Sequence, residues 1–210
     1  MDKRKLKEEW LNVVDSEYSS NATADLAFDE LCFKYEDSSR HYHNLHHIDF
    51  MLKLAREYRA SIKSYKSLFF AIWFHDAIQN KGQNNEYKSA KYARKSLNAM
   101  SVPSIIAEKT YDLIISTKTH QPNDVEDCNL FLDFDLAILA TEPRIYELYA
   151  NNCRKEYSVP RFLYNRGRAN FLLNMLKRDN IFCSDLIRNN YEQKARNNIK
   201  RELANLGVRT

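Results

Sequence analysis

The stretch Leu68–Asp76 reads Leu-Phe-Phe-Ala-Ile-Trp-Phe-His-Asp, seven apolar residues followed by a histidine and an aspartate. An apolar run of this density is normally buried. Burying His75 and Asp76 without partners would cost roughly 2–7 kcal/mol for each uncompensated polar group, and more for a charge. We therefore expect the two side chains to bond to each other or to share a cation, whose other ligands must lie elsewhere in the chain.

The composition predicts an all-α fold. The chain has 210 residues and 44% apolar content, enough for one good-sized core, but only three glycines and four prolines. A β-rich fold needs turn residues every few positions, so this scarcity argues against it. We expect a single helical domain over residues 1–210. Apolar periodicity places helices at about 4–18, 23–35, 65–78, 142–156, 160–178 and 185–205, with further helices opening near His43, Glu86, Pro103 and Leu130.

The charge balance argues against a nucleic-acid polymer as partner. There are 32 basic and 28 acidic residues, and the excess of four is spread along the chain. A nucleic-acid binder usually shows a larger, clustered excess. Basic residues do gather in the last quarter, where a solvated helical surface and a positive rim around a small phosphorylated molecule are both compatible with the pattern.

The cysteines and the N-terminus indicate a cytoplasmic protein with reduced thiols. The first residues, Met-Asp-Lys-Arg-Lys, are polar and unlike a signal peptide. No apolar run approaches the roughly 18–20 residues needed to cross a membrane, so no membrane partner is expected. The cysteines are widely spaced, without a Cys-x-x-Cys pair, at Cys32, Cys128, Cys153 and Cys183.

A histidine-rich segment is the first place to look for the missing ligands. Four of the six histidines lie within Arg40–Ile48. If a helix has begun by His43, then His43 and His47 share a face, and His47 lies at the edge of the buried stripe. We expect His47 to be a metal ligand, His43 to be a substrate or supporting group, and His41 and His46 to be exposed. The alternative is a polar, tag-like cluster at a helix start.

A second pair of acidic residues interrupts an apolar run. Asp133 and Asp135 stand within Leu130–Ala140. On a helix the two are about 200° apart, so both cannot reach one ion. One should be a ligand, and the other should meet a basic side chain or a histidine.

Two more polar side chains have both structural and functional readings. Glu86 lies in the first turn of an expected helix, where it is either a charge that favours the helix dipole or a base that activates water. His120 lies at an expected helix C-terminus, where it either satisfies carbonyl groups or contacts a substrate phosphate.

The pattern His47, His75-Asp76 and Asp135 resembles the HD-domain superfamily of metal-dependent phosphohydrolases, and in particular its branch of predicted metal-dependent HD phosphohydrolases. In this resemblance His47 matches the first metal histidine, His75 and Asp76 match the signature pair, and Asp135 matches the last ligand, with Asp133 as the alternative. The resemblance covers nearly the whole chain. It is carried by 40–48, 71–77, 85–90, 117–120, 132–139, 154–157, 167–168 and 195–198, with departures at Gln79 and Ala140.

The resemblance implies hydrolysis of a phosphate ester of a nucleotide or other small phosphorylated metabolite. Mixed nitrogen and oxygen ligands suit Mn, Fe, Co, Ni or Mg better than a closed zinc site. Such an ion would activate a water and polarise the phosphoryl group. The expected catalytic groups are Glu86, Asp133 and Asp76, and the expected substrate groups are Arg40, His43, Lys118, His120 and Arg168.

Two rival readings remain open at this point. A helical protein with the same metal site could sense a nucleotide without turning it over. His75 and Asp76 could also form a buried structural pair without a metal. A homodimer is compatible with either the enzyme or the sensor.

Overall fold

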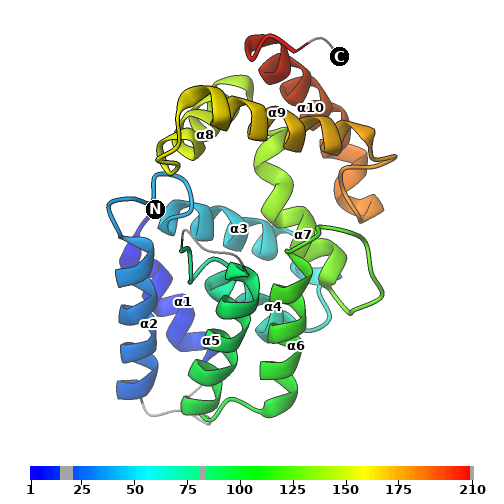
Figure 1. Ribbon diagram of the computed structural model, residues 1–210. Helices are drawn as coiled ribbons and strands as arrows, with labels where there is room; N and C mark the ends of the chain where they lie inside the picture. Colours follow the sequence, from blue (N-terminus) through cyan, green and yellow to red (C-terminus); the bar gives the residue numbers. More distant parts are fainter. Residues whose placement is uncertain (15–20, 81–83, 209–210) are drawn as a thin grey trace. The chain divides into compact units, whose positions relative to one another are not determined.

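The computed structural model describes residues 1–14, 21–80 and 84–208, which form two compact units, Met1–Phe131 and Leu132–Thr210. The described residues form ten α-helices and two short 3-10 helices, without a β-strand (Figure 1). The predicted all-α fold is therefore confirmed. The expectation of one HD-like domain over residues 1–210 stays a prediction.

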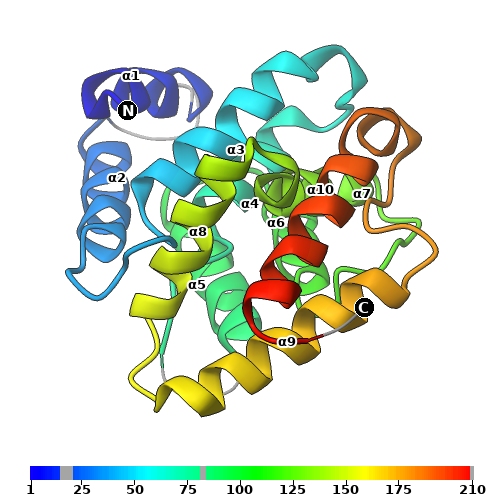
Figure 2. The same ribbon diagram turned by 90° about the horizontal axis from the view of Figure 1, so that it is seen from above.

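The first unit contains six complete helices and the start of a seventh. Figures 1 and 2 show α1 beside α2, and Figure 1 shows α5 running beside α6. The elements are α1 (Lys3–Val13), α2 (Asn21–Tyr35), α3 (Leu45–Glu57), η1 (Arg59–Ser61), α4 (Tyr65–Phe74), α5 (Asn85–Ala99), α6 (Ser104–Ser116) and the first turn of α7 (Cys128–Leu136).

Helix α4 is the core of this unit, because every residue from Ser67 to Phe74 is buried. It packs against α3, α5 and α6. From α1, the fully buried ring of Trp10 meets the rings of Phe70 and Trp73 edge-on, with centroids 5.7 and 5.6 Å away. The indole N–H of Trp10 also donates to the carbonyl of Ala24 at 3.0 Å. One side chain therefore holds α1 against both α2 and α4.

Helix α4 is shorter than predicted, since it ends at Phe74 instead of continuing through the His-Asp pair. Side chains take its last carbonyl groups. The hydroxyl of Tyr35 donates to the carbonyl of Trp73 at 2.9 Å, and Nδ1 of His75 lies 2.9 Å from the carbonyl oxygen of Ile72. These partners satisfy the helix end, which otherwise leaves carbonyl groups unbonded.

Two helix bounds near the N-terminal half also differ from the prediction. Helix α1 ends at Val13, and the predicted continuation through 15–18 lies outside the described residues. Helix α3 begins at Leu45, because the Asn44 side chain accepts the backbone N–H of His46 at 2.9 Å and caps the helix. His43 therefore precedes the helix, so the condition under which it would share a helical face with His47 is not met.

The second unit consists of the rest of α7, η2 (Ala137–Ala140), α8 (Pro143–Lys155), α9 (Arg161–Lys177) and α10 (Asp185–Asn205). The last three helices agree with the predicted bounds to within a residue. Helix α10 packs against η2 and α9, and Figure 2 looks onto α8, α9 and α10. The buried amide of Asn198 donates to the carbonyls of Leu139 and Thr141 at 2.9 and 2.8 Å, which joins α10 to the end of η2.

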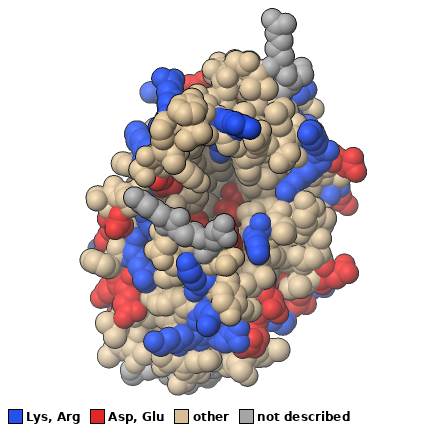
Figure 3. Space-filling model, in the orientation of Figure 1, with Lys and Arg blue, Asp and Glu red and all other residues tan. Residues whose placement is uncertain are grey.

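The surface carries both signs of charge. On the face drawn in Figure 3, Lys and Arg side chains are interspersed with Asp and Glu. The four cysteines are free thiols, as predicted, and three of them are buried. Among the described residues, no helix combines the length and the apolar character needed to span a membrane.

Candidate metal centre

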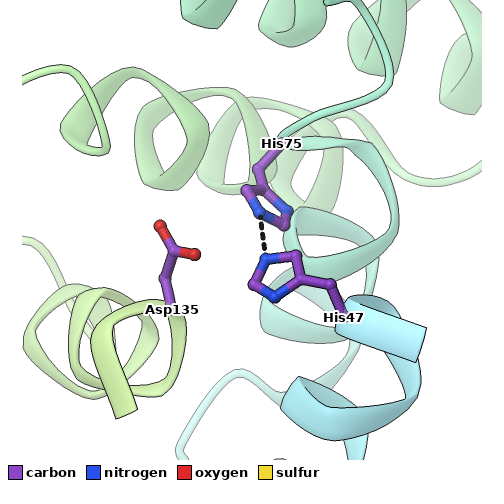
Figure 4. A group of neighbouring side chains, drawn as sticks. All are labelled: His47, His75 and Asp135. Carbon is purple, nitrogen blue, oxygen red and sulfur yellow. Dashed lines mark hydrogen bonds between the residues drawn. The ribbon is translucent and has the colours of Figure 1, made fainter. Parts of the chain in front are cut away.

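Two buried histidines form the centre of the site. His75 directly follows α4 and His47 lies in the first turn of α3, and each residue is only 3% exposed. Their Nε2 atoms face each other at 3.2 Å, as Figure 4 shows. The predicted proximity of these two side chains is confirmed.

The tautomer of His75 is fixed by its surroundings. Its Nδ1 lies 2.9 Å from the carbonyl oxygen of Ile72, which can only accept, so Nδ1 carries the proton and Nε2 presents a lone pair. Nδ1 of His47 lies 3.1 Å from the hydroxyl of Tyr42, which can donate or accept. A lone pair directed at a second imidazole nitrogen needs a proton or a cation between them. Hydrogen bonds on the Nδ1 side of the ring, like those to Ile72 and Tyr42, are typical of histidines that bind a metal through Nε2.

Asp76 places a carboxylate oxygen beside both rings. Its Oδ2 lies 3.2 Å from Nε2 of His75 and 3.9 Å from Nε2 of His47. Neighbouring ligand atoms around an octahedral ion, each about 2.1 Å from it, lie about 3 Å apart. The separations of 3.2 Å are therefore of the size that one shared ion requires.

Asp135 supplies a further carboxylate from α7. Its carboxylate and the ring nitrogens of His47 and His75 offer ligand atoms that all lie within 4.8 Å of one another (Figure 4). Helix α7 is unbroken from Cys128 to Leu136, and its residue Phe131 meets the His75 ring edge-on at 5.9 Å between centroids. Asp135 follows Phe131 by about one helical turn, which puts it on the same face. These three side chains could hold a metal ion.

Asp133, two residues before Asp135, has a different environment, which is formed by residues of the second unit. Its fully buried carboxylate accepts the backbone N–H groups of Cys183 and Ser184 at 2.6 and 2.8 Å, and the Ser184 hydroxyl. Burial raises the pKa of this carboxyl to about 6, although the hydrogen bonds oppose the rise. Peptide N–H groups and a hydroxyl bind this carboxylate directly, and the basic side chain that the sequence predicted is Arg188, whose positive charge also opposes the rise in pKa. Asp133 thereby holds the start of α10.

Arg40 orients the site through the backbone. Its guanidinium donates to the carbonyl oxygens of His43, Asp76 and Ala77 at 3.1, 2.7 and 3.3 Å, and its charge lies over the Tyr35 ring, 5.0 Å from the centroid. These bonds connect the turn before α3 with the turn after α4. Arg40 therefore has a structural role that the sequence did not reveal, and its guanidinium is already bonded to backbone carbonyls at the place where a phosphate contact was predicted.

His43 and His120 both lie outside helices. Nε2 of His43 is 4.0 Å from Oδ2 of Asp76, and its Nδ1 is 3.3 Å from the amide nitrogen of Gln79. His120 has a φ of 47° and its N–H donates to the carbonyl of Ser116 at 3.2 Å, which closes the end of α6. The geometry of His43 agrees with a supporting role, and the backbone of His120 agrees with the helix-end alternative.

Glu86 and Lys118 line one cavity of about 880 Å³ in the first unit. Glu86 lies in the first turn of α5, and the exposed Lys118 follows α6. The volume is within the range of about 300–1,000 Å³ that is common for small-molecule sites. The remaining lining residues are Asn84, Tyr87, Tyr111, Asp112, Ile115, Ser116, Thr119, Asn123 and Val125. The structure thus places Glu86 and Lys118 at one cavity, and none of the predicted metal ligands is among the residues that line it.

Arg168 lies in an ion pair of the second unit. Its Nε and Nη2 atoms donate to the two carboxylate oxygens of Glu202 at 2.9 and 3.0 Å, and the side chains are only 9% and 13% exposed. Nη1 also donates to the Tyr149 hydroxyl at 3.1 Å. Because Glu202 already neutralises the charge of Arg168, we leave this residue out of the proposed substrate site.

The sequence did not single out the groups that orient the two histidines. Tyr42 stands five residues before His47, inside the histidine-rich segment, so its neighbourhood was the one available signal. The carbonyl of Ile72 could not be identified from the sequence, because every residue has a backbone carbonyl. With these groups in place, His47, His75 and Asp135 form a group that could hold a metal ion. Comparisons of the chain with models of protein families, with curated proteins and with solved structures found no match.

Proposed function

We propose that the chain is a metal-dependent phosphohydrolase that cleaves the phosphate ester of a nucleotide or another small phosphorylated metabolite. One observation carries the proposal: the Nε2 atoms of the buried His47 and His75 face each other at 3.2 Å, with a carboxylate oxygen of Asp76 at the same distance from His75. The likeness of the sequence pattern to the HD-domain superfamily supports the same reaction class.

The residues that would hold the cation are His47, His75, Asp76 and Asp135. When bound, the ion supplies Lewis-acid chemistry, which makes water more acidic near neutral pH and draws charge from a phosphoryl group. In the overall reaction a water oxygen bonds to phosphorus, the bond from phosphorus to the ester oxygen breaks, and the alcohol leaves with a proton.

The chain's own residues prepare this chemistry. The Ile72 carbonyl keeps the proton of His75 on Nδ1, and the Tyr42 hydroxyl holds the ring of His47. Arg40 fixes the backbone of the turn that carries Asp76. Because these bonds set the ring orientations beforehand, little reorganisation is needed when the cation binds.

The cavity lined by Glu86 and Lys118 is the proposed substrate pocket. Lys118 would pair with phosphate oxygens as a compact positive charge. Glu86 would accept the proton of the attacking water at its carboxylate, a role in which a positioned base contributes about 10²–10⁴-fold.

The first experiment is the metal content of the full chain, purified without a chelator or a histidine tag. We expect about one equivalent of a divalent ion, in line with one cluster of ligands. Asp76→Asn should lose it, because the variant lacks a carboxylate 3.2 Å from His75. Asp124→Asn is the matched control, since Asp124 is exposed on the surface. Equal metal content in all three proteins would contradict the assignment of Asp76.

The second experiment measures phosphate released from a panel of nucleoside monophosphates and sugar phosphates. Glu86→Gln should keep the metal and lose about 10²–10⁴-fold in turnover. Metal-loaded wild type that binds a nucleotide without releasing phosphate would instead support the sensing alternative. Wild type without metal, even after incubation with Mn or Mg, would overturn the phosphohydrolase.

A further inference from the structure

The second unit contains a cavity of about 660 Å³ that shares no residue with the candidate metal centre. Three helices form its wall: α8, the N-terminal part of α9 and the C-terminal part of α10. Its lining is mostly polar and consists of Tyr146, Glu147, Ala150, Asn151, Arg154, Arg161, Tyr164, Asn165, Asn198, Arg201, Glu202, Asn205 and Leu206.

Two of its arginines have guanidinium groups without a bonding partner among the described residues. Arg161 and Arg201 make no hydrogen bond or ion pair within the part of the chain that the structure describes. Arg154 differs, because it donates to the carbonyls of Tyr157 and Val159 at 2.6 and 2.9 Å and closes the end of α8. The guanidinium N–H groups available to a ligand are therefore those of Arg161 and Arg201, while the charge of Arg154 remains unmatched.

The acidic residues of the wall leave this positive charge in excess. Glu202 is bound by the buried guanidinium of Arg168 and by the Tyr146 hydroxyl, so its charge is matched within the protein. Glu147 is exposed and is one negative charge against three arginines. A ligand with negative charge is the one that this balance favours.

The start of α9 also favours a ligand with negative charge. Helix α9 has 17 residues and begins at Arg161 after Pro160, which provides no side-chain cap for the first N–H groups. Arg161, Tyr164 and Asn165 all line the cavity, so the cavity meets the first turns of the helix. The positive end of the helix dipole lies there and favours an anion.

We propose that this cavity binds a small organic phosphate, with the phosphate group held by Arg161 and Arg201. A guanidinium group can donate two parallel hydrogen bonds to two oxygens of one phosphate group. The amides of Asn151, Asn165 and Asn205 can donate to and accept from the hydroxyl groups of the ligand body. The volume of about 660 Å³ accommodates a ligand of sugar-phosphate to mononucleotide size. This site is independent of whether the chain hydrolyses phosphate esters.

The test is calorimetric titration of the full chain with ribose 5-phosphate, after metal has been removed with a chelator and the chelator has been dialysed away. Without a divalent ion the candidate metal centre neither turns over nor coordinates the probe. We expect saturable binding of ribose 5-phosphate and none of ribose. The double variant Arg161→Gln/Arg201→Gln should weaken the binding by about tenfold or more, because two charge-assisted contacts are lost.

The double variant Arg166→Gln/Lys200→Gln is the matched control. It removes the same charge from α9 and α10 at exposed positions that do not line the cavity, and should bind as the wild type does. Equal weakening in both double variants would overturn the site, because only net charge would then matter. Binding of inorganic phosphate as tight as that of ribose 5-phosphate would overturn the assigned role of the asparagines.

Discussion

Asp133 is a buried carboxylate to which we assign a structural role. It accepts two backbone N–H groups and a hydroxyl at the start of α10. Asp133→Ala would leave the half-buried N–H groups of Cys183 and Ser184 without their acceptor. Each unsatisfied buried donor costs about 1–3 kcal/mol, so we expect a loss of about 3 kcal/mol in the free energy of unfolding. Urea denaturation followed by circular dichroism measures it.

The control for this prediction is Ser184→Ala, which removes the capping hydroxyl of α10 and leaves the carboxylate in place. Its expected cost is about 1 kcal/mol. Asp133→Ala should also keep the metal content of the wild type, since Asp133 is not a proposed ligand. If Asp133→Ala has the stability of the wild type but has lost its metal, the structural role is contradicted and Asp133 is a candidate metal ligand.

At the scale of elements, one buried network joins three helices of the second unit. Tyr146 and Tyr149 of α8, Arg168 of α9 and Glu202 of α10 are hydrogen-bonded together. Arg168→Ala would leave the buried carboxylate of Glu202 without its cation. Breaking one partner of a buried pair costs about 3–5 kcal/mol, and we expect a loss of this size in the free energy of unfolding.

The exposed Arg166 on the same helix provides the comparison. Arg166→Ala should change the free energy of unfolding by no more than about 0.5 kcal/mol, as is usual for surface substitutions. If Arg168→Ala unfolds at the same urea concentration as Arg166→Ala, the network does not hold the three helices together.

The positions of the helices were predictable, and several of their ends were not. Periodic apolar residues mark a helix because its buried face repeats along the sequence. Its end depends on which groups satisfy the last carbonyls. For α4 these groups are Tyr35 and His75, and the hydroxyl of Tyr35 comes from 38 residues away. A local pattern contains no trace of such a partner, so α4 was predicted too long.

The same distinction applies to the candidate site. His75 was found because a polar side chain in an apolar run requires a partner, and His47 because it lies at the edge of a buried stripe in a histidine-rich segment. The structure brings the two together. Asp133 and Asp135 carry the same local signal, so the sequence could not separate them. What separates them is Ser184, 51 residues after Asp133, whose hydroxyl and N–H occupy that carboxylate.

At the scale of the whole molecule, the distribution of charge limits the class of partner. The chain has 32 basic and 28 acidic residues, and both kinds share the face drawn in Figure 3. Several of the arginines are also bonded within the protein, among them Arg40, Arg168 and Arg196. Nucleic-acid affinity rises with the number of phosphate groups that free basic side chains neutralise. Arginines bonded in this way are not free to neutralise phosphate groups.

From this distribution we predict that the chain binds nucleic-acid polymers no more tightly than a non-specific protein does, with a Kd of about 10⁻⁶ M or weaker at physiological salt. Fluorescence anisotropy of a labelled single strand and a labelled duplex, each repeated at two salt concentrations, measures this. A Kd below about 10⁻⁶ M that weakens steeply with salt would show a continuous basic surface and contradict the prediction. Weak binding would instead leave Arg161 and Arg201 as isolated charges, which suit one phosphate group better than a phosphate backbone.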